Sequence, residues 1–385
     1  MIGITKKGST LPKAALLLLT VLSIVYVITI GETTTNTLPK PEVTDNSQTR
    51  TLQQTTTQSL PVKKCEKNAS VTSLPGFDAL PEIYKTFLYY RHCRYFPMLL
   101  DNPDKCGKIS GEKEPFLLLV IKSSPQNYER REVLRKTWAQ ERMYKGAWIR
   151  RVFISGTSGA GVEKHNLNKL LKLENEDHHD ILQWDFADSF YNLTLKQTLL
   201  LGWLEEQCPS ARFLFNGDDD VFANTDNMVE YLQSINNSYG QKHLFTGHLL
   251  TTEKPVRWTG SKYFVPLLIQ ATNKYEPYCG GGGFLLSAYT ASVIYKTSQE
   301  IPLHPIDDAY MGMCLFKVGL KPSSHLGVKT LGIQLPMNTP DNSGPCYMKE
   351  LLLLHRFLPS QMYVMWKEVN DPNLICSTTN KLSKD

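Results

Sequence analysis

The stretch ARFLFNGDDDVF, residues 211–222, joins an apolar run to three consecutive aspartates, Asp218 to Asp220. The apolar run predicts a buried strand that ends at the aspartates. Three adjacent carboxylates repel one another, and burying them costs free energy. Either they lie on a solvated turn that starts at Asn216-Gly217, or something positive neutralises them.

Apolar runs alternate with helix-forming segments throughout residues 115–220. The predicted strands are 114–124, 148–157, 181–186 and 211–222 with its exit turn, and the predicted helices are 127–140, 162–180 and 192–208, preceded by a helix after Pro81. This alternation predicts an α/β fold with a mostly parallel central sheet and helices on both faces. Ligands bind such sheets at the carboxyl ends of the strands, which is where the three aspartates lie.

The N-terminal segment contains an uncharged apolar stretch, AALLLLTVLSIVYVITI, residues 14–30. Its length is close to the minimum that crosses a bilayer, so we expect a transmembrane signal-anchor. Three lysines precede it, Lys6, Lys7 and Lys13. They predict that residues 1–13 stay in the cytoplasm and that the rest of the chain is lumenal. A cleaved signal peptide is the alternative interpretation.

Residues 33–64 are rich in Thr, Gln and Pro and contain no aromatic residue. Such a segment buries too little apolar surface to fold by itself. We therefore expect a disordered stem over 31–75 and a lumenal catalytic domain over 76–385.

Cysteines and glycosylation motifs agree with a secretory location. All eight cysteines follow the apolar stretch: Cys65, Cys93, Cys106, Cys208, Cys279, Cys314, Cys346 and Cys376. None forms a CxxC pair, so we expect disulfides rather than a zinc site, with the pairing left open. N-glycosylation sequons occur at Asn68, Asn192 and Asn236, and Asn192 could also cap the helix that follows it.

Carboxylates at a strand end suit a hard divalent cation such as Mg²⁺ or Mn²⁺. The sequence contains neither a GxxxxGK[ST] loop nor a GxGxxG motif, which argues against a P-loop or a dinucleotide site. The net charge of +5 is mild for 385 residues. No basic patch or zinc-finger spacing supports nucleic-acid binding. A lumenal cation site of this kind indicates a sugar nucleotide.

Five ordered blocks carry a family resemblance. They are RREVLRKTW (130–138), WDFADSFYNLTLK (184–196), FNGDDDVF (215–222), EPYCGGGGFLLS (276–287) and PIDDAYMGMCL (305–315). With them the chain resembles the β-1,3-glycosyltransferases, glycosyltransferase family 31, over about residues 80–376. Within the family it is most similar to the β-1,3-N-acetylglucosaminyltransferases that act on galactose-ended O-glycans and polylactosamine.

The resemblance implies a GT-A fold, inversion at the anomeric carbon and roles for the acidic triplet. Asp220 is similar to the direct metal ligand, with Asp218 and Asp219 contacting the ribose, the sugar or a metal-bound water, and Asp218 a second metal ligand. His355 in LLLLHRF matches the family's C-terminal metal-binding histidine. On the residues alone, a packed core or strand-end residue is the favoured interpretation of His355, and the family position makes the metal ligand an equal alternative.

In PIDDAY, Asp308 is similar to the general base of the family and Asp307 to its neighbour. A carboxylate within hydrogen-bond reach can take the proton of the acceptor hydroxyl, especially if a neighbouring carboxylate raises its pKa. The alternative is that these aspartates cap the helix that follows.

The resemblance also implies donor-binding residues. Arg131 and Arg135, spaced i, i+4, would bind the diphosphate, and Lys196 is a weaker candidate; the alternative for each is a solvated basic face. In CGGGGF, Gly281 and Gly282 would let the chain approach the donor or acceptor closely, instead of forming a flexible loop. Trp138, Trp184 and Trp258 could stack on a sugar or base, although most buried tryptophans belong to the core.

Together these features predict a Golgi type II membrane enzyme that uses Mn²⁺ or Mg²⁺. It would transfer N-acetylglucosamine from UDP-N-acetylglucosamine to the 3-hydroxyl of a terminal β-galactose on a glycan. The alternatives are a UDP-galactose-dependent β-1,3-galactosyltransferase, a non-catalytic lumenal lectin or chaperone on the same fold, and a glycosidase. Self-association and association with other glycosyltransferases stay open.

Overall fold

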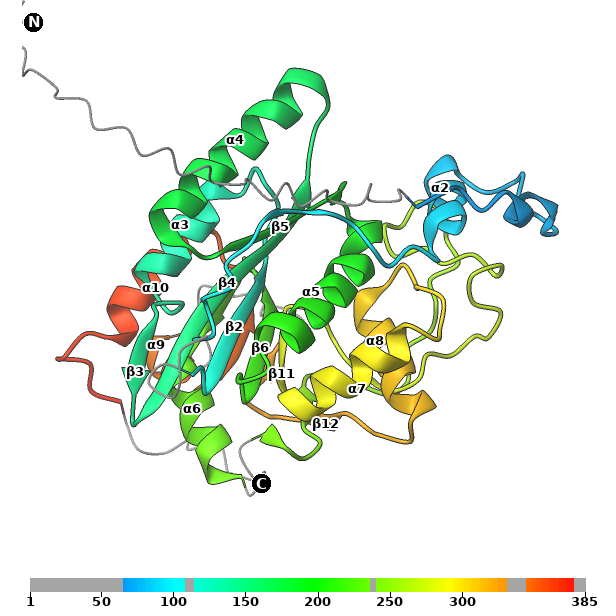
Figure 1. Ribbon diagram of the computed structural model, residues 1–385. Helices are drawn as coiled ribbons and strands as arrows, with labels where there is room; N and C mark the ends of the chain where they lie inside the picture. Colours follow the sequence, from blue (N-terminus) through cyan, green and yellow to red (C-terminus); the bar gives the residue numbers. More distant parts are fainter. Residues whose placement is uncertain (1–64, 108–113, 236–239, 331–343, 377–385) are drawn as a thin grey trace, which may run out of the picture. The chain divides into compact units, whose positions relative to one another are not determined.

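Four parallel strands form the centre of the main sheet, and antiparallel strands flank them. In spatial order the strands are β1 (Met98–Leu100), β5 (Ile181–Ala187), β4 (Ala147–Thr157), β2 (Leu117–Lys122), β6 (Phe213–Asp218), β11 (Gly283–Ser287), β8 (Phe245–Gly247) and β12 (Ser323–Ser324), with β3 (Arg142–Tyr144) paired to β4. The central strands β5, β4, β2 and β6 are the four predicted ones, so the prediction of a parallel sheet centre is confirmed (Figure 1).

The computed structural model describes residues 65–107, 114–235, 240–330 and 344–376, all within the unit Pro61–Asp385. The predicted cytoplasmic tail 1–13, the signal-anchor 14–30, most of the stem 31–75 and the sequon at Asn236 lie outside the described residues. Among the helices that are described, none has both the length and the hydropathy needed to cross a bilayer.

Strand β2 shows why the sheet is covered on both faces. Leu117, Leu119 and Ile121 join one buried cluster, and Leu118 and Val120 join another on the opposite side. A strand buried on both faces reads as a continuous apolar run, as LLLVI does here.

Helices supply the outer layer of each cluster, on the two sides of the sheet seen in Figure 1. On the first side lie α3 (Tyr128–Lys136), α4 (Gly161–His178), α6 (Thr225–Ser234), α9 (Pro345–Glu350) and α10 (Pro359–Val369). On the second side lie α2 (Glu82–Tyr90), α5 (Leu193–Gln207), α7 (Ala288–Ser298) and α8 (Asp307–Lys317). Each predicted helix is present, and α5 follows the short 3-10 helix η2 (Phe190–Asn192).

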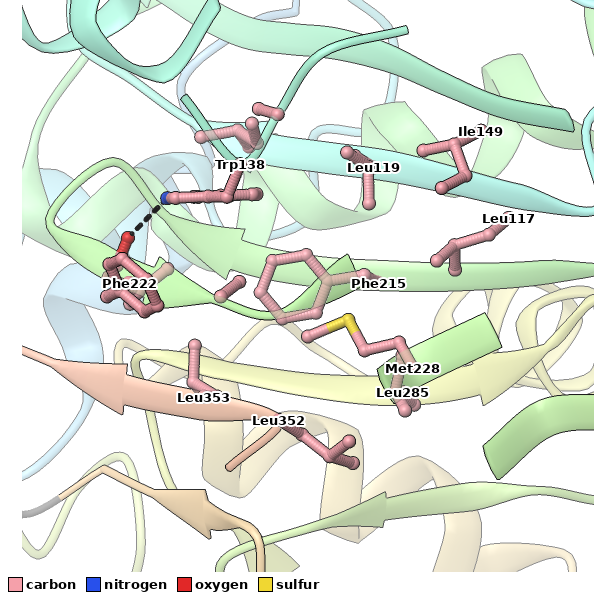
Figure 2. Close-up of a cluster of buried hydrophobic side chains, with 14 of the residues drawn as sticks. Leu117, Leu119, Trp138, Ile149, Phe215, Phe222, Met228, Leu285, Leu352 and Leu353 are labelled. Atoms are coloured by element: carbon pink, nitrogen blue, oxygen red, sulfur yellow. Dashed lines mark hydrogen bonds between the residues drawn. The ribbon is translucent and has the colours of Figure 1, made fainter. Parts of the chain in front are cut away.

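The aromatic core beneath the acidic triplet positions its turn. Trp138 follows α3, is fully buried and donates its indole hydrogen to the carbonyl of Val221 at 2.9 Å (Figure 2). Its ring meets the Phe215 ring edge-on, with the centroids 5.9 Å apart. Asn216 and Gly217 belong to β6 rather than to a turn, and Asn216 is bonded to Gln197 at 3.0 Å. The solvated-turn interpretation is therefore wrong for Asn216-Gly217; the turn lies at Asp219 and Asp220.

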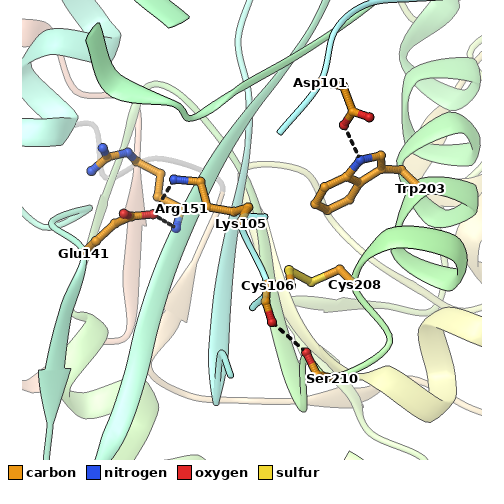
Figure 3. The surroundings of a disulfide bond; sticks show 8 residues. All are labelled: Asp101, Lys105, Cys106, Glu141, Arg151, Trp203, Cys208 and Ser210. Atoms are coloured by element: carbon orange, nitrogen blue, oxygen red, sulfur yellow. Dashed lines mark hydrogen bonds and ion pairs between the residues drawn. A yellow bond between two sulfur atoms is a disulfide. The ribbon is translucent and has the colours of Figure 1, made fainter. Parts of the chain in front are cut away.

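Six of the eight cysteines form disulfides, as the prediction of an oxidising compartment requires. The pairs are Cys65–Cys93, Cys106–Cys208 and Cys346–Cys376, and Cys279 and Cys314 are buried thiols. Cys106–Cys208 ties the chain before β2 to the end of α5. Around it, Ser210 donates to the carbonyl of Cys106 at 3.0 Å, and Lys105 pairs with Glu141 at 2.8 Å (Figure 3).

Replacing the central aromatic of the first cluster tests this account of the core. Phe215→Ala removes a ring that fills the space above Gly217 and Gly283, and should lower the free energy of unfolding by about 3–5 kcal/mol. Urea denaturation followed by tryptophan fluorescence measures it. Val162→Ala, on a side chain that is 76% exposed, should change little. Equal stability of the two variants would show that this cluster does not support the fold.

Candidate active site

Three potential metal ligands meet at the acidic turn. Strand β7 (Val221–Ala223) follows the turn and pairs with β14 (Leu353–His355), which places His355 opposite Val221. The His355 Nε2 lies 3.0 Å from Oδ1 of Asp220 and 3.8 Å from Oδ2 of Asp218. One ligand atom from each of the three residues lies within 4.8 Å of the others. The structure thus brings together the three residues predicted to hold a cation.

Hydrogen bonding orients the His355 ring toward the two carboxylates. Its Nδ1 lies 3.0 Å from the carbonyl oxygen of Thr330. Because a carbonyl only accepts, Nδ1 carries the hydrogen and Nε2 faces the acids. Burial acts to lower the pKa of His355, but the hydrogen bond and charge of Asp220 outweigh it and raise the pKa. Once Nε2 loses its proton, two carboxylates and one imidazole form a donor set that suits Mn²⁺.

Lys122 is the site residue that sequence reasoning missed. It ends β2, directly opposite Asp218 in the parallel ladder. Its buried Nζ lies 2.9 Å from Asp218 and 3.1 Å from Asp307. Burial acts to lower the pKa of Lys122, but the charges of Asp218, Asp307 and Asp308 raise it well above its usual value. The sequence signal for this role was a lysine at the carboxyl end of the apolar run LLLVIK, the same end of the strand at which β6 carries the aspartates.

Asp307 and Asp308 begin α8. Ile306 occupies the capping position and neither aspartate caps the helix through its side chain, so the capping alternative is not observed. Among the described residues, the buried Oδ1 of Asp308 has no hydrogen-bond partner. Burial and then the Asp307 charge raise the pKa of Asp308 well above its usual value, against the opposing effect of Lys122. A carboxylate with a raised pKa and a free oxygen can accept a proton.

Two glycines of CGGGGF pack against these side chains. A Cβ atom at position 281 would lie 2.9 Å from Oδ2 of Asp308, and one at position 282 would lie 2.9 Å from the His355 ring. Gly282 also has φ +95°, a conformation that favours glycine. Gly281 and Gly282 therefore allow a close approach, and the groups they approach are Asp308 and His355.

Asp219 points away from the other two aspartates of the triplet. Its Oδ2 accepts hydrogen bonds from Ser123 Oγ at 2.7 Å and Asn127 Nδ2 at 2.8 Å. The carboxylate therefore holds the turn between β2 and α3, and this geometry does not support the predicted contact of Asp219 with ribose or sugar.

The predicted diphosphate role of Arg131 is not supported either. Arg131 is 1% exposed, and its guanidinium donates to both carboxylate oxygens of Glu174 at 2.7 and 2.8 Å. Its remaining donors reach Ser123 Oγ and the carbonyls of Ser124 and Pro125. All five N–H donors of a guanidinium are then engaged, so none is free for phosphate.

Arg135 is engaged in the same way. It donates to both oxygens of Asp180 at 2.9 and 2.8 Å and pairs with Glu174 at 2.7 Å. Asp180 is fully buried and also binds Arg151. The i, i+4 arginines share a helix face, as predicted, but that face meets acids of the scaffold rather than a diphosphate.

Lys196 is neither solvated nor free. Its Nζ is buried, pairs with Asp188 at 2.8 Å and lies 3.4 Å from the carbonyl of Ser123. Lys196 thus links the ends of β5 and β2 beside the site.

Two of the three sequons lie in the described chain. Asn68 is exposed, and its side chain accepts from the backbone N–H of Ser70 at the start of η1 (Ala69–Ser73). Asn192 is half-buried and donates to the carbonyl of Ala187 at 2.8 Å. Its side chain does not cap α5, which leaves the predicted capping role unfulfilled.

Comparison with known proteins places the site in a family. A family model described as galactosyltransferase matches residues 129–325, which include the acidic triplet and Asp308. The chain belongs to the galactosyltransferase family. The family resemblance that the five sequence blocks indicated is confirmed.

The relatives share most of their length with this chain. N-acetyllactosaminide beta-1,3-N-acetylglucosaminyltransferase 3 of Homo sapiens is 48% identical over 83% of this chain and 84% of the relative. Acetylgalactosaminyl-O-glycosyl-glycoprotein beta-1,3-N-acetylglucosaminyltransferase of Homo sapiens is also 48% identical, over 84% and 83%. UDP-GlcNAc:betaGal beta-1,3-N-acetylglucosaminyltransferase 7 of Mus musculus is 41% identical, over 81% and 77%.

A matched pair of variants tests the scaffold role of Arg131. Arg131→Met removes two hydrogen bonds from the buried carboxylate of Glu174, which keeps its contact with Arg135. The loss should lower the free energy of unfolding by about 3–5 kcal/mol. Arg130→Met, on the same helix but with a partly exposed side chain 3.8 Å from Asp219, should cost about 1 kcal/mol or less. Thermal unfolding and UDP titration calorimetry measure the two effects. Unchanged stability with a large loss of UDP affinity would return Arg131 to the nucleotide site.

Proposed function

We propose that this chain is an inverting β-1,3-N-acetylglucosaminyltransferase. It moves N-acetylglucosamine from UDP-N-acetylglucosamine to the 3-hydroxyl of a terminal β-galactose on a glycoprotein glycan. The observation that carries the proposal is Lys122, whose Nζ joins Asp218 of the acidic turn to Asp307 beside Asp308. Asp218, on the side of the donor, and Asp307, next to the acceptor-activating Asp308, therefore both contact the buried ammonium of Lys122.

Asp218, Asp220 and His355 would hold a divalent cation, Mn²⁺ or Mg²⁺. When bound, the cation neutralises charge on the departing diphosphate. The Nδ1–H of His355 stays on the Thr330 carbonyl, which keeps Nε2 directed at the cation position. The donor set includes an imidazole, which favours Mn²⁺ over Mg²⁺.

Asp308 accepts the proton of the acceptor hydroxyl. The acceptor O3 forms a bond to the anomeric carbon as the bond from that carbon to the UDP phosphate oxygen breaks, so UDP leaves from the opposite face. The O3 proton passes to the carboxylate of Asp308. The charge of Lys122 outweighs burial and lowers the pKa of Asp218, whereas burial and then the charge of Asp307 raise the pKa of Asp308.

The assembled site weighs against two of the alternatives. A non-catalytic lectin or chaperone would not need a cation triad joined to a carboxylate base through a buried lysine. A glycosidase would not need a seat for a cation beside its carboxylates.

A second acceptor has specific support. One relative's name refers to N-acetyllactosaminide and another's to acetylgalactosaminyl-O-glycosyl-glycoprotein, at the same 48% identity. N-acetylgalactosamine linked to protein is therefore the second candidate acceptor, after terminal galactose.

We propose in addition a Golgi type II membrane protein, anchored by residues 14–30. The predicted stem over 31–75 is shortened to the part before Cys65, because the Cys65–Cys93 disulfide and η1 attach residues 65–75 to the lumenal domain. The three disulfides support an oxidising compartment. Its partners would be the UDP-sugar, the glycan acceptor and the membrane, with self-association or association with other glycosyltransferases left open.

A donor and acceptor panel tests the function. The purified full-length chain should transfer from UDP-N-acetylglucosamine to a galactose-ended oligosaccharide in Mn²⁺, and EDTA should abolish the transfer. Product linkage is read by mass spectrometry and NMR. Preference for UDP-galactose would select the sister activity, and transfer that survives EDTA would remove the cation. His355→Ala should weaken Mn²⁺ binding, measured by titration calorimetry, whereas Asn68→Ala should not.

Asp308→Asn tests the base. Because burial and the Asp307 charge raise the pKa of Asp308, the wild-type kcat should fall as the pH drops through that raised value, since the protonated carboxyl cannot accept a proton. The variant should lose kcat about a thousandfold and lack that acid limb. Its KM for UDP-N-acetylglucosamine and its melting temperature should stay unchanged. Wild-type turnover in the variant would exclude Asp308 as the base.

A further inference from the structure

A long loop, residues 251–277, leaves and re-enters the fold beside the proposed base. Its two ends are β9 (Leu249–Leu250) and β10 (Tyr278–Cys279), which pair with each other. Tyr275 and Tyr278 pack on Ala309, which follows Asp308, with Leu250 and Ile306 against them. An acceptor whose hydroxyl lies at Asp308 is therefore close to the two ends of this loop.

Hydrogen bonds hold the loop in one shape. The Arg257 guanidinium donates to the carbonyls of Val265 at 2.6 Å, Gln270 at 2.8 Å and Thr272 at 2.9 Å. Val265 also donates its own N–H to the carbonyl of Val256 at 2.9 Å. Tyr84 of α2 donates to the carbonyl of Phe264 at 2.7 Å. A loop clamped at these points presents its side chains in fixed positions.

The loop presents an exposed tryptophan. Trp258 is 71% exposed, whereas Trp138 and Trp184, the other two tryptophans considered for stacking, are 0% and 3% exposed and belong to the core. A Cβ at position 260 would lie 2.5 Å from Cζ2 of the Trp258 indole. Gly260 thus lets the ring lie against the backbone, which supports one part of it and leaves the rest in solvent.

A second aromatic residue lies close by in the sequence. Tyr263 is 45% exposed and meets the Phe190 ring edge-on, with the centroids 5.4 Å apart. Lys262 Nζ lies 4.9 Å from the centroid of Tyr263 and 5.4 Å from that of Phe190. Phe190 opens η2, shortly after Asp188, which pairs with the buried Lys196.

We propose that Trp258, assisted by Tyr263, binds the acceptor glycan by stacking on the sugars that precede its terminal galactose. The inference rests on the proposed function, which places the acceptor hydroxyl at Asp308. Aromatic rings with one supported and one exposed side offer an apolar surface to the C–H face of a pyranose. Thr259, Ser261 and Lys262 lie between these two rings in PVRWTGSKYF. The surface therefore mixes polar and aromatic groups, as suits a sugar rather than a large apolar protein partner.

Comparing long and short acceptors isolates the stacking. With a galactose-ended tetrasaccharide, Trp258→Ala should raise KM about tenfold, the size expected for truncating an aromatic anchor, and leave kcat unchanged. With methyl β-galactoside, which lacks the preceding sugars, KM should not change. Trp258→Phe should restore most of the affinity. Leu267→Ala, on a side chain of the same loop that is 65% exposed, is the matched control and should behave as wild type.

If Trp258→Ala changed KM equally for both acceptors, or for neither, Trp258 and Tyr263 would not be a stacking platform for the acceptor glycan. Saturation-transfer NMR measures tetrasaccharide binding without turnover, so it separates the two proposals. A chain that transfers nothing but binds the tetrasaccharide through Trp258 would sink the proposed function and keep the platform. If Trp258→Ala left glycan binding intact and instead reduced cosedimentation with phosphatidylcholine vesicles or the sedimentation coefficient, the loop would serve a membrane or a second copy, and the platform would be wrong.

Discussion

The site depends on one buried ammonium between carboxylates from two distant elements. Lys122 closes β2, Asp218 closes the adjacent β6, and Asp307 opens α8. Without Lys122, the carboxylates of Asp218 and Asp307 would lie close together in a poorly solvated environment. Their repulsion and desolvation would destabilise the folded state. The pKa of Asp218 is lowered because, although burial acts to raise it, the charge of Lys122 outweighs the burial. The same contact therefore stabilises the fold and keeps a potential cation ligand ionised.

A chain of hydrogen bonds connects buried charged residues of the scaffold to the acidic turn of the site. Glu174 of α4 holds Arg131, Arg131 donates to Ser123 Oγ, and Ser123 donates to Asp219 at 2.7 Å. Removing one member of such a buried network leaves the next one unpaired, which is why single changes there should be severe. Arg131 of the block RREVLRKTW thus acts on the acidic turn through Ser123, by positioning the loop after β2.

The central strands and helices could be predicted because each is coded locally, by an apolar run or a helical spacing. The contact partner of a side chain, by contrast, depends on residues far away in the sequence. Spacing shows that Arg131 and Arg135 share a face, but Glu174 and Asp180 decide what the face meets. The meeting of His355 with Asp220 depends on β7 pairing with β14, a non-local contact that only family resemblance indicated. Lys122 was missed since it reads as the end of an apolar run.

The charge balance of the site argues for a cation more strongly than the ligand geometry alone. Asp218, Asp220, Asp307 and Asp308 face Lys122 and a histidine, so negative charge exceeds positive even when His355 is protonated. Burial and then the charge of Asp307 raise the pKa of Asp308, so this excess adds to the effect of burial. A diphosphate donor adds further negative charge and would be repelled without compensation. The donor and a divalent cation should therefore enter together, at the turn where ligand atoms of Asp218, Asp220 and His355 lie within 4.8 Å of one another.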